Sequence, residues 1–224
     1  MSILSNEDLI LRVPLFASLD PAEASQIANA VSKKRYRKGE CMAHQGVHHK
    51  HLVILLTGRA RLVMSDYQQR EVIIERVLPG EFAGELSLFD DQPLPASLIA
   101  ETQTDVLLIE SDVFLGCLQN SSGVVLELLR AMARRSRRAG HKIETLALED
   151  VFGRVADALW ELSAPNADGL RVTQAKVSRQ DVAKMIGASR EMVSRVMKEF
   201  MNRGVIGTRD DGSVWVHEHL FIKK

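Results

Sequence analysis

The chain has 224 residues, enough for one large domain or two modest ones. Hydrophobic residues make up 46% of it, which is ample for buried cores, and 29 basic residues are balanced by 29 acidic ones. A formal charge of zero excludes a uniformly basic nucleic-acid binder, although a protein that reads DNA needs positive charge only locally. We expect no signal peptide, and no stretch reaches the about 18 apolar residues of a membrane span, so we expect a cytoplasmic protein without membrane contact.

The front half of the chain, residues 33–114, is divided into short strand-like pieces rich in Val, Ile and Leu. Turn signals such as Thr57-Gly58 and Pro79-Gly80 separate these pieces at short intervals. That rhythm predicts an antiparallel jelly roll or barrel, with or without a bound ligand. The expected strands cover residues 51–56, 60–64, 71–78 and 98–109.

One long helix is expected over residues 123–149. Apolar and small residues recur along it every three or four positions, which is typical of the seam between two paired helices. The small residues in the middle suit either a close approach of the helices or a ligand between them. The expected seam residues are Leu129, Met132, Ser136, Ala139, Ile143 and Leu146.

Basic residues surround the middle of this helix, and a basic run on a helix is equally well a solvated face. Of the arginines there, only Arg135 flanks the seam, with Lys142 in the equivalent place one heptad later. In a symmetric dimer, two Arg135 side chains would approach each other and repel unless an anion lay between them.

Two short helices joined by a glycine turn are expected between residues 178 and 200, the layout of a helix-turn-helix. Ser178 and Asp181 resemble a capping box at the start of the first helix. Gly187 supplies the backbone freedom that a tight turn requires. Ser189 is expected to cap the second helix.

The second of these helices carries a polar arc and an apolar arc. Arginine can bind O6 and N7 of guanine together, and glutamate can accept from N4 of cytosine, so we expect four residues of the polar arc to read base edges of DNA: Arg190, Glu191, Ser194 and Arg195. The alternative is an i,i+4 ion pair between Glu191 and Arg195 on a solvated helix. The polar arc contains Arg190, Glu191, Ser194, Arg195 and Lys198, and the apolar arc contains Met192, Val193, Val196, Met197 and Phe200.

The end of the chain predicts a hairpin wing, with strands over residues 205–208 and 214–217 around Asp210-Asp211-Gly212. Arg209 in this wing is expected to lie near a DNA phosphate. The connector 164–169 is expected to be a short loop.

The segment 177–196 resembles the recognition motif of the cyclic-AMP receptor protein and FNR family of bacterial regulators, through the pattern of Arg190, Glu191 and Arg195. Ser194 is similar to the serine of the FNR branch. The resemblance implies a TGTGA-like half-site, or a relative that shares its GA end. It also implies DNA phosphate contacts by Ser178, Arg179, Gln180 and Ser189.

The glycine spacing of the front half, ending in the block 79–85, resembles the cyclic-nucleotide-binding domain of the same family. The resemblance implies that Glu85, which follows Gly84, holds a ribose hydroxyl and that backbone amides meet the phosphate. The arginine that neutralises this phosphate in the family is missing, because no arginine lies between Arg76 and Arg130. We therefore expect an effector other than cyclic AMP bound in the usual mode.

The adenine contacts of the family are missing too, because alignment on the hinge places Ala139 and Gly140 where the family has two hydroxyls. Some members of the family answer to cyclic di-GMP, whose two phosphates would suit a pair of Arg135 side chains. A constitutive protein, or one that senses an unrelated metabolite, is the open alternative. The candidate effector-binding residues are Gly84, Glu85, Arg135 and Lys142.

Metal chemistry is the remaining candidate. His49-Lys50-His51 is similar to the histidine pair of metal-binding cupins, but the next acid, Glu71, is too distant for that motif, so we expect neither a metal site nor an enzyme. Cys41 and Cys117 are expected to be reduced, and the chain lacks the cysteine cluster with which the FNR branch holds an iron-sulfur centre. The densest set of potential metal ligands is His44, His48, His49 and His51.

Together these features predict an α+β protein with an N-terminal cyclic-nucleotide-binding-type β jelly-roll barrel, a long dimerisation helix and a C-terminal winged helix-turn-helix. The expected domains span residues 1–122, 123–149 and 150–224. We expect a homodimeric regulator that binds palindromic double-stranded DNA, a small-molecule effector and RNA polymerase. The alternative is a ligand- or metal-binding barrel protein whose DNA module is vestigial.

Overall fold

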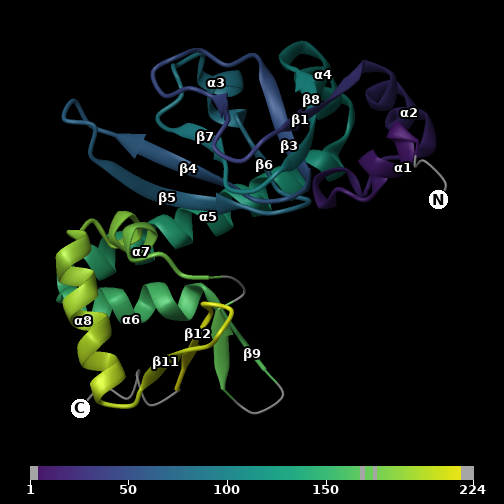
Figure 1. Ribbon diagram of the computed structural model, residues 1–224. Coiled ribbons are helices and arrows are strands. Elements are labelled where there is room, and N and C mark those ends of the chain that lie inside the picture. Colours follow the sequence, from purple (N-terminus) through teal and green to yellow (C-terminus); the bar gives the residue numbers. More distant parts are fainter. Residues whose placement is uncertain (1–4, 167–169, 174–175, 218–224) are drawn as a thin grey trace. The chain divides into compact units, whose positions relative to one another are not determined.

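The computed structural model describes residues 5–166, 170–173 and 176–217. The chain forms two compact units, residues 1–136 and 137–224 (Figure 1). The helix α5 (Ser122–Leu148) is continuous and contributes to both units. The other elements of the first unit are α1 (Asn6–Leu11), the 3-10 helix η1 (Pro14–Phe16), α2 (Pro21–Ala30), β1 (Val31–Tyr36), β2 (Cys41–Ala43), β3 (His51–Thr57), β4 (Ala60–Ser65), β5 (Glu71–Val77), β6 (Phe82–Ala83), α3 (Glu85–Asp90), β7 (Ser97–Ala100), β8 (Thr104–Glu110) and α4 (Ser111–Asn120).

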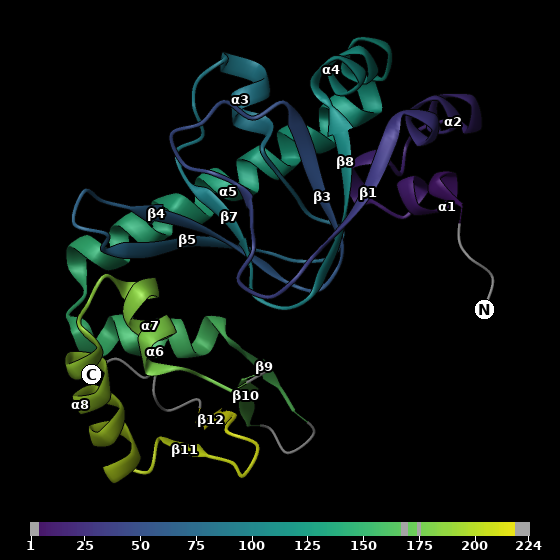
Figure 2. The same cartoon turned by 45° about the horizontal axis from the view of Figure 1, so that its top comes forward.

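Two antiparallel four-stranded sheets form the barrel of the first unit, with the strand orders β1-β8-β3-β6 and β2-β7-β4-β5. Their facing side chains share one buried cluster, which includes Val53 and Val106 from one sheet and Ala60, Val77 and Leu98 from the other. Figure 2 shows the β4–β5 hairpin extending away from β1, β8 and β3. The expected jelly-roll-type barrel is therefore confirmed.

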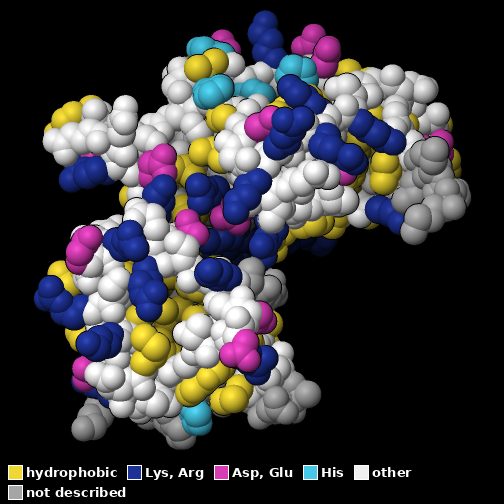
Figure 3. All heavy atoms as spheres, viewed as in Figure 1, with side chains coloured by type: hydrophobic (Ala, Val, Ile, Leu, Met, Phe, Trp, Pro, Cys, Tyr) yellow, Lys and Arg dark blue, Asp and Glu magenta, His cyan; other side chains and the backbone are white. Residues whose placement is uncertain are grey.

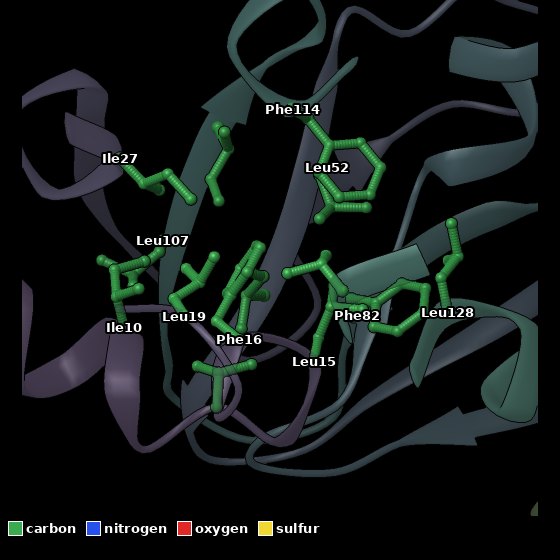
Figure 4. Close-up of a cluster of buried hydrophobic side chains, with 14 of the residues drawn as sticks. Ile10, Leu15, Phe16, Leu19, Ile27, Leu52, Phe82, Leu107, Phe114 and Leu128 are labelled. Carbon is green, nitrogen blue, oxygen red and sulfur yellow. The ribbon is translucent and has the colours of Figure 1, made fainter. Parts of the chain in front are cut away.

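Strand β3 is buried on both faces, since residues 52–55 are all buried, which explains why it reads as a continuous apolar run. Successive side chains of a strand point to opposite faces, so Val53 packs inside the barrel while Leu52 and Ile54 pack against helices. Figure 4 shows this second cluster, in which Phe16 and Phe114 meet edge to face with their ring centroids 6.5 Å apart. The helical layer contains α1, α2, α4 and the first turns of α5.

The expected strand 98–109 is wrong as a single element, because residues 101–103 form a turn between β7 and β8. The two strands belong to different sheets, so the chain crosses from one sheet to the other here. The backbone N–H of Arg59 donates to Oγ1 of Thr102 at 3.0 Å, and the N–H of Glu101 donates to the carbonyl of Arg59 at 2.8 Å. A run of Val, Ile and Leu does not reveal such a crossing.

The helical layer also contains one helix, α4, that begins where the sequence pattern still predicts strands. The expected strand region extends to residue 114, yet residues 111–120 form α4, with Phe114 fully buried. The long helix is expected over residues 123–149 and is observed over 122–148.

Besides the second half of α5, the described part of the second unit contains the helices α6, α7 and α8 and a small sheet of strand order β11-β12-β10-β9. The hairpin wing expected around residues 210–212 is confirmed as β11 and β12. The connector expected to be a loop begins as a strand, and its residues 167–169 lie outside the described residues. The elements are α6 (Val151–Glu161), β9 (Ser163–Pro165), β10 (Arg171–Thr173), α7 (Arg179–Ile186), α8 (Arg190–Asn202), β11 (Ile206–Thr208) and β12 (Val214–Val216).

Within the described ranges, no helix has both the length and the apolar character to cross a bilayer.

Candidate DNA interface and effector pocket

The helix-turn-helix is built from α7 and α8, which contact each other and both contact α6. Gly187 ends α7 with φ 63°, a left-handed conformation that glycine adopts without a steric penalty. Ser189 then caps α8 by accepting a hydrogen bond from the N–H of Met192 at 3.2 Å. Ser178 caps α7 by accepting a hydrogen bond from the N–H of Gln180 at 3.2 Å, whereas a capping box would use the N–H of the third residue of the helix.

The recognition helix α8 divides into a buried and an exposed face. Val193, Val196 and Met197 are at most 4% exposed, and the ring of Phe200 packs edge to face on Phe152 at 5.9 Å. Met192, expected on the buried arc, is 41% exposed and is the one error in that assignment. Apolar packing therefore fixes α8 without using its polar side chains.

The expected base-reading residues lie together at the start of α8. Arg190, Glu191 and Arg195 are exposed, and Ser194 is half-buried. Among the described residues, Glu191 and Arg195 form no ion pair with each other, so the solvated-ion-pair alternative has no support. Arg190 stands at the first helical position, where the helix dipole disfavours a cation, and an anionic partner such as DNA would remove that cost.

The expected phosphate contacts lie at two helix starts and in the wing. Ser178, Arg179 and Gln180 are exposed at the start of α7, where the positive end of the helix dipole favours anions. Ser189 is exposed at the start of α8, and Arg209 is exposed beside the wing turn. Figure 3 shows Lys and Arg side chains over the surface that α7 and α8 form. This clustering supplies the local positive charge that the neutral overall composition lacks.

One residue that the sequence interpretation missed supports the turn between α7 and α8. Nη1 of Arg154, on α6, donates to the carbonyl oxygen of Ile186 at 3.1 Å. Ile186 is the last residue of α7, so the guanidinium binds the negative end of that helix. The side chain thereby ties α6 to the helix-turn-helix, a contact between distant segments that no local pattern reveals.

Two of the expected effector-binding residues, Glu85 and Arg135, lie together in an ionic cluster. Nη1 of Arg135 donates to Oε1 of Glu85 at 2.6 Å, and Nη2 donates to the carbonyl oxygen of Phe82. Nε of Arg135 lies 3.4 Å from Oε2 of Glu75, and the guanidinium carbon lies 4.8 Å from the centroid of the Phe82 ring. We refer to Arg135, Glu85, Glu75 and Phe82 as the Arg135 cluster.

The Arg135 cluster is shielded from water. The side chains of Arg135 and Glu75 are each 17% exposed, and that of Glu85 is 6% exposed. Arg135 was expected to face an anion at the helix seam, and its guanidinium is instead bound to its own barrel. Glu75 was missed, although it stands between the buried Ile73 and Val77 in strict alternation, which is a detectable signal of an inward-facing acid.

Gly84 comes directly before Glu85 with φ 93°, and a Cβ atom there would lie 2.7 Å from the carbonyl oxygen of His51. Glycine is therefore required for the approach of α3 to β3. The loop that follows α3 places Leu94 and Ala96 in buried positions, at 7% and 6% exposure. That loop thus contributes an apolar side chain, Leu94, to the buried cluster between the two sheets.

The expected seam residues of α5 are mostly exposed on the single chain. Leu129 is 59% exposed, Ile143 67% and Leu146 43%, while Met132 packs against the barrel's helical layer. Exposed apolar side chains at this spacing are what a helix pair would cover. Lys142, the other candidate effector contact, is half-buried and belongs to the second unit.

Within the described residues no three His, Cys, Asp or Glu side chains are grouped to hold a metal ion. The rings of His49 and His51 lie 5.8 Å apart, and burial, followed by the charge of His51, lowers the pKa of His49. Burial raises the pKa of Cys117 to about 11, which makes its thiol unreactive.

Comparison with known proteins agrees with this architecture. A family model for the cyclic nucleotide-binding domain matches residues 33–121, and one for the Crp-like helix-turn-helix domain matches residues 153–218. The chain is 32% identical over 183 residues to the cAMP-activated global transcriptional regulator Vfr of Pseudomonas aeruginosa, covering 78% of this chain and 84% of the relative. The chain belongs to the CRP/FNR family of transcription regulators.

Other members of the CRP/FNR family are similarly related. The cAMP-activated regulator CRP of Salmonella typhimurium is 30% identical over 178 residues, covering 77% of this chain and 83% of the relative. The structure of the c-di-GMP responsive regulator CLP of Xanthomonas campestris has the same fold, with a TM-score of 0.76 at 24% identity, covering 88% of this chain and 99% of that one. These relatives are regulators rather than enzymes, and so is this chain.

Proposed function

We propose that the protein is a homodimer that reads palindromic DNA with TGTGA-like half-sites. The observation that carries the proposal is the exposed set of Arg190, Glu191 and Arg195 at the start of α8. The seam on α5 supports the dimer, since Leu129 and Ile143 expose apolar surface along one helix. Two recognition helices would then enter successive major grooves about one helical turn apart.

Domain limits of 1–122, 123–149 and 150–224 fit this proposal, with α5 as the dimerisation element. A ligand or a mutation that favours one arrangement of α5 would shift the population of DNA-binding dimers. RNA polymerase is the proposed further partner at the promoter, and promoter binding would place the protein in the cytoplasm.

We do not expect cyclic AMP to bind in the mode that is usual for the family, because the loop that follows α3 carries Pro95 and Ala96 and no arginine. One structural neighbour, the regulator CLP, is responsive to cyclic di-GMP, and this supports the same dinucleotide as a candidate effector for this protein. The cyclic di-GMP hypothesis assumed that Arg135 faces the seam. The bonds of Arg135 to Glu85 and Glu75 weaken this assumption.

The test is fluorescence anisotropy with a duplex that carries two TGTGA half-sites, compared with a scrambled duplex of the same composition. We expect the specific duplex to bind at least about 1,000-fold more tightly at fixed physiological salt. Equal affinity for both duplexes would support the alternative, a barrel protein with a vestigial DNA module. Sedimentation of the free protein measures the dimer directly.

A further inference from the structure

We propose that one face of the long helix α5 is a docking surface for an acidic amphipathic helix of another protein. This face carries four exposed arginines, which we call the α5 stripe: Arg130, Arg134, Arg137 and Arg138. Such an interaction would be separate from the reading of DNA by α8 and from the Arg135 cluster.

The spacing of the four arginines places them in one line along the helix. At about 100° per residue they fall within an arc of roughly 100°. They extend over about 12 Å of the helix axis, which is about two turns. Figure 2 shows α5 as one uninterrupted helix, so these relative positions follow from the helix alone. The stripe lies roughly opposite the predicted seam of Leu129 and Ile143, so pairing at the seam would leave it open.

The charge of the α5 stripe is not balanced within the helix. Residues 128–143 contain six Lys and Arg residues and no Asp or Glu. Nη1 of Arg130 lies 2.5 Å from Oε1 of Glu127, so that arginine is neutralised. Arg134 and Arg137, by contrast, form no ion pair with any described residue. The middle of the stripe therefore presents positive charge to the surroundings.

This concentration of one sign is unfavourable for the isolated helix. Arg134 is the i,i+4 neighbour of both Arg130 and Arg138, and like charges at this spacing destabilise a helix. A face that served only solubility would intersperse the two signs, as α5 does where Glu127 precedes Arg130. An anionic partner would remove the repulsion, and the stripe therefore indicates one.

An apolar border beside the stripe favours a protein as that partner. Leu126 is 48% exposed and lies one turn before Arg130, outside the predicted seam. Ala133 is exposed and lies one turn before Arg137. Arginine binds carboxylate and phosphate alike, but a nucleic-acid backbone gains nothing from a leucine, and one leucine is too little apolar surface to hold a membrane. A helix with a row of Asp or Glu beside a row of apolar residues matches both features.

The first experiment measures whether the full-length protein binds such a helix. The probe is a fluorescein-labelled helical peptide of about 18 residues, with glutamates at i,i+4 spacing and leucines on the adjoining face. Its matched control carries glutamine in place of each glutamate. At physiological salt we expect a Kd of about 10–100 μM for the acidic peptide and at least about tenfold weaker binding of the control. No change in anisotropy up to about 500 μM protein would overturn the proposal.

Charge reversal tests the location of the site. The double variant Arg134→Glu and Arg137→Glu should weaken binding of the acidic peptide by about tenfold or more. The matched control is Arg37→Glu and Lys38→Glu, which makes the same change of charge at two exposed residues between β1 and β2. This control should weaken binding by less than about threefold. If the control loses the peptide and the α5 variant keeps it, the stripe is not the site.

Thermal unfolding separates loss of the site from loss of the fold. The α5 variant should keep the wild-type Tm, because a carboxylate at position 134 faces Arg130 and Arg138 at favourable spacing. If it does not fold, Arg134→Gln and Arg137→Gln supplies the milder change and should weaken the peptide by about threefold or more. Full peptide affinity in that folded variant would overturn the proposal.

The class of partner is tested with the same variants. Leu126→Ser should weaken the acidic peptide by about threefold or more and leave binding of a random DNA duplex unchanged, since only the peptide contacts leucine. The other probes are that duplex and vesicles of phosphatidylglycerol. If the double charge reversal at residues 134 and 137 abolishes binding of either probe and leaves the peptide bound, the stripe recognises phosphate and the proposal is wrong.

Discussion

The stability of the Arg135 cluster can be measured by a double-mutant cycle of Arg135→Met and Glu85→Gln. Methionine keeps the unbranched stem of Arg135 while removing its donors. Breaking a buried ion pair by removing one partner costs about 3–5 kcal/mol. Since Arg135 keeps 17% of its side chain exposed and Glu85 6%, we expect the lower end, about 3 kcal/mol for Arg135→Met.

The coupling between the two residues is the sharper quantity. A hydrogen bond to a charged group contributes about 1.5–3 kcal/mol, and we expect a coupling free energy in that range for the 2.6 Å contact. Urea unfolding followed by circular dichroism supplies the free energies. Trp160 and Trp215 both lie in the second unit, so tryptophan fluorescence would not report on the first. Hydrogen exchange of peptides from β3 and β8 therefore assigns the loss of stability to the first unit.

Two results would refute the reasoning on the cluster. A coupling below about 0.5 kcal/mol would mean that the contact contributes no more than an exposed pair. An equal loss in Arg134→Met would mean that the helix, and not the cluster, determines the stability.

Three further predictions concern DNA and the dimer. Arg190→Ala or Glu191→Ala should each cost about 1–3 kcal/mol of specific binding and relax preference at one base pair, measured by competition with singly substituted duplexes, whereas Lys198→Ala should preserve the preference. Arg179→Ala should weaken binding evenly on specific and random duplexes and lower the slope of log affinity against log salt by about 0.9; an unchanged slope would remove its phosphate role. Ile143→Glu should convert the dimer to monomer in sedimentation, and a stable dimer would argue against the seam.

The local features of this chain were predictable because they depend on short sequence spacings. The helix-turn-helix, its Ser189 cap and the wing were all visible, since the turn needs Gly187 and the helices need apolar residues at intervals of three and four. The predicted division of α8 into an exposed and a buried face was likewise correct, except that Met192, expected on the buried face, is exposed.

The features that the sequence did not predict depend on contacts between distant segments. Arg135 lies fifty residues from Glu85, and Arg154 lies thirty-two from Ile186. The basic run around Arg135 suggested an anion between two helices, because the acids on the barrel that bind it could not be placed from spacing alone. The alternation of Glu75 with the buried Ile73 and Val77 was the one sequence feature that indicated an inward-facing acid.

The two faces of α8 have separate tasks, which bears on how such proteins diversify. Val193, Val196 and Met197 anchor the helix, and none of the exposed side chains at its start takes part in that packing. Targets can therefore be exchanged by altering a few solvent-facing positions while the scaffold is conserved. Gene duplication followed by such substitutions would yield regulators with new promoters and unchanged folding, and the same route is open to engineers who wish to redirect this one.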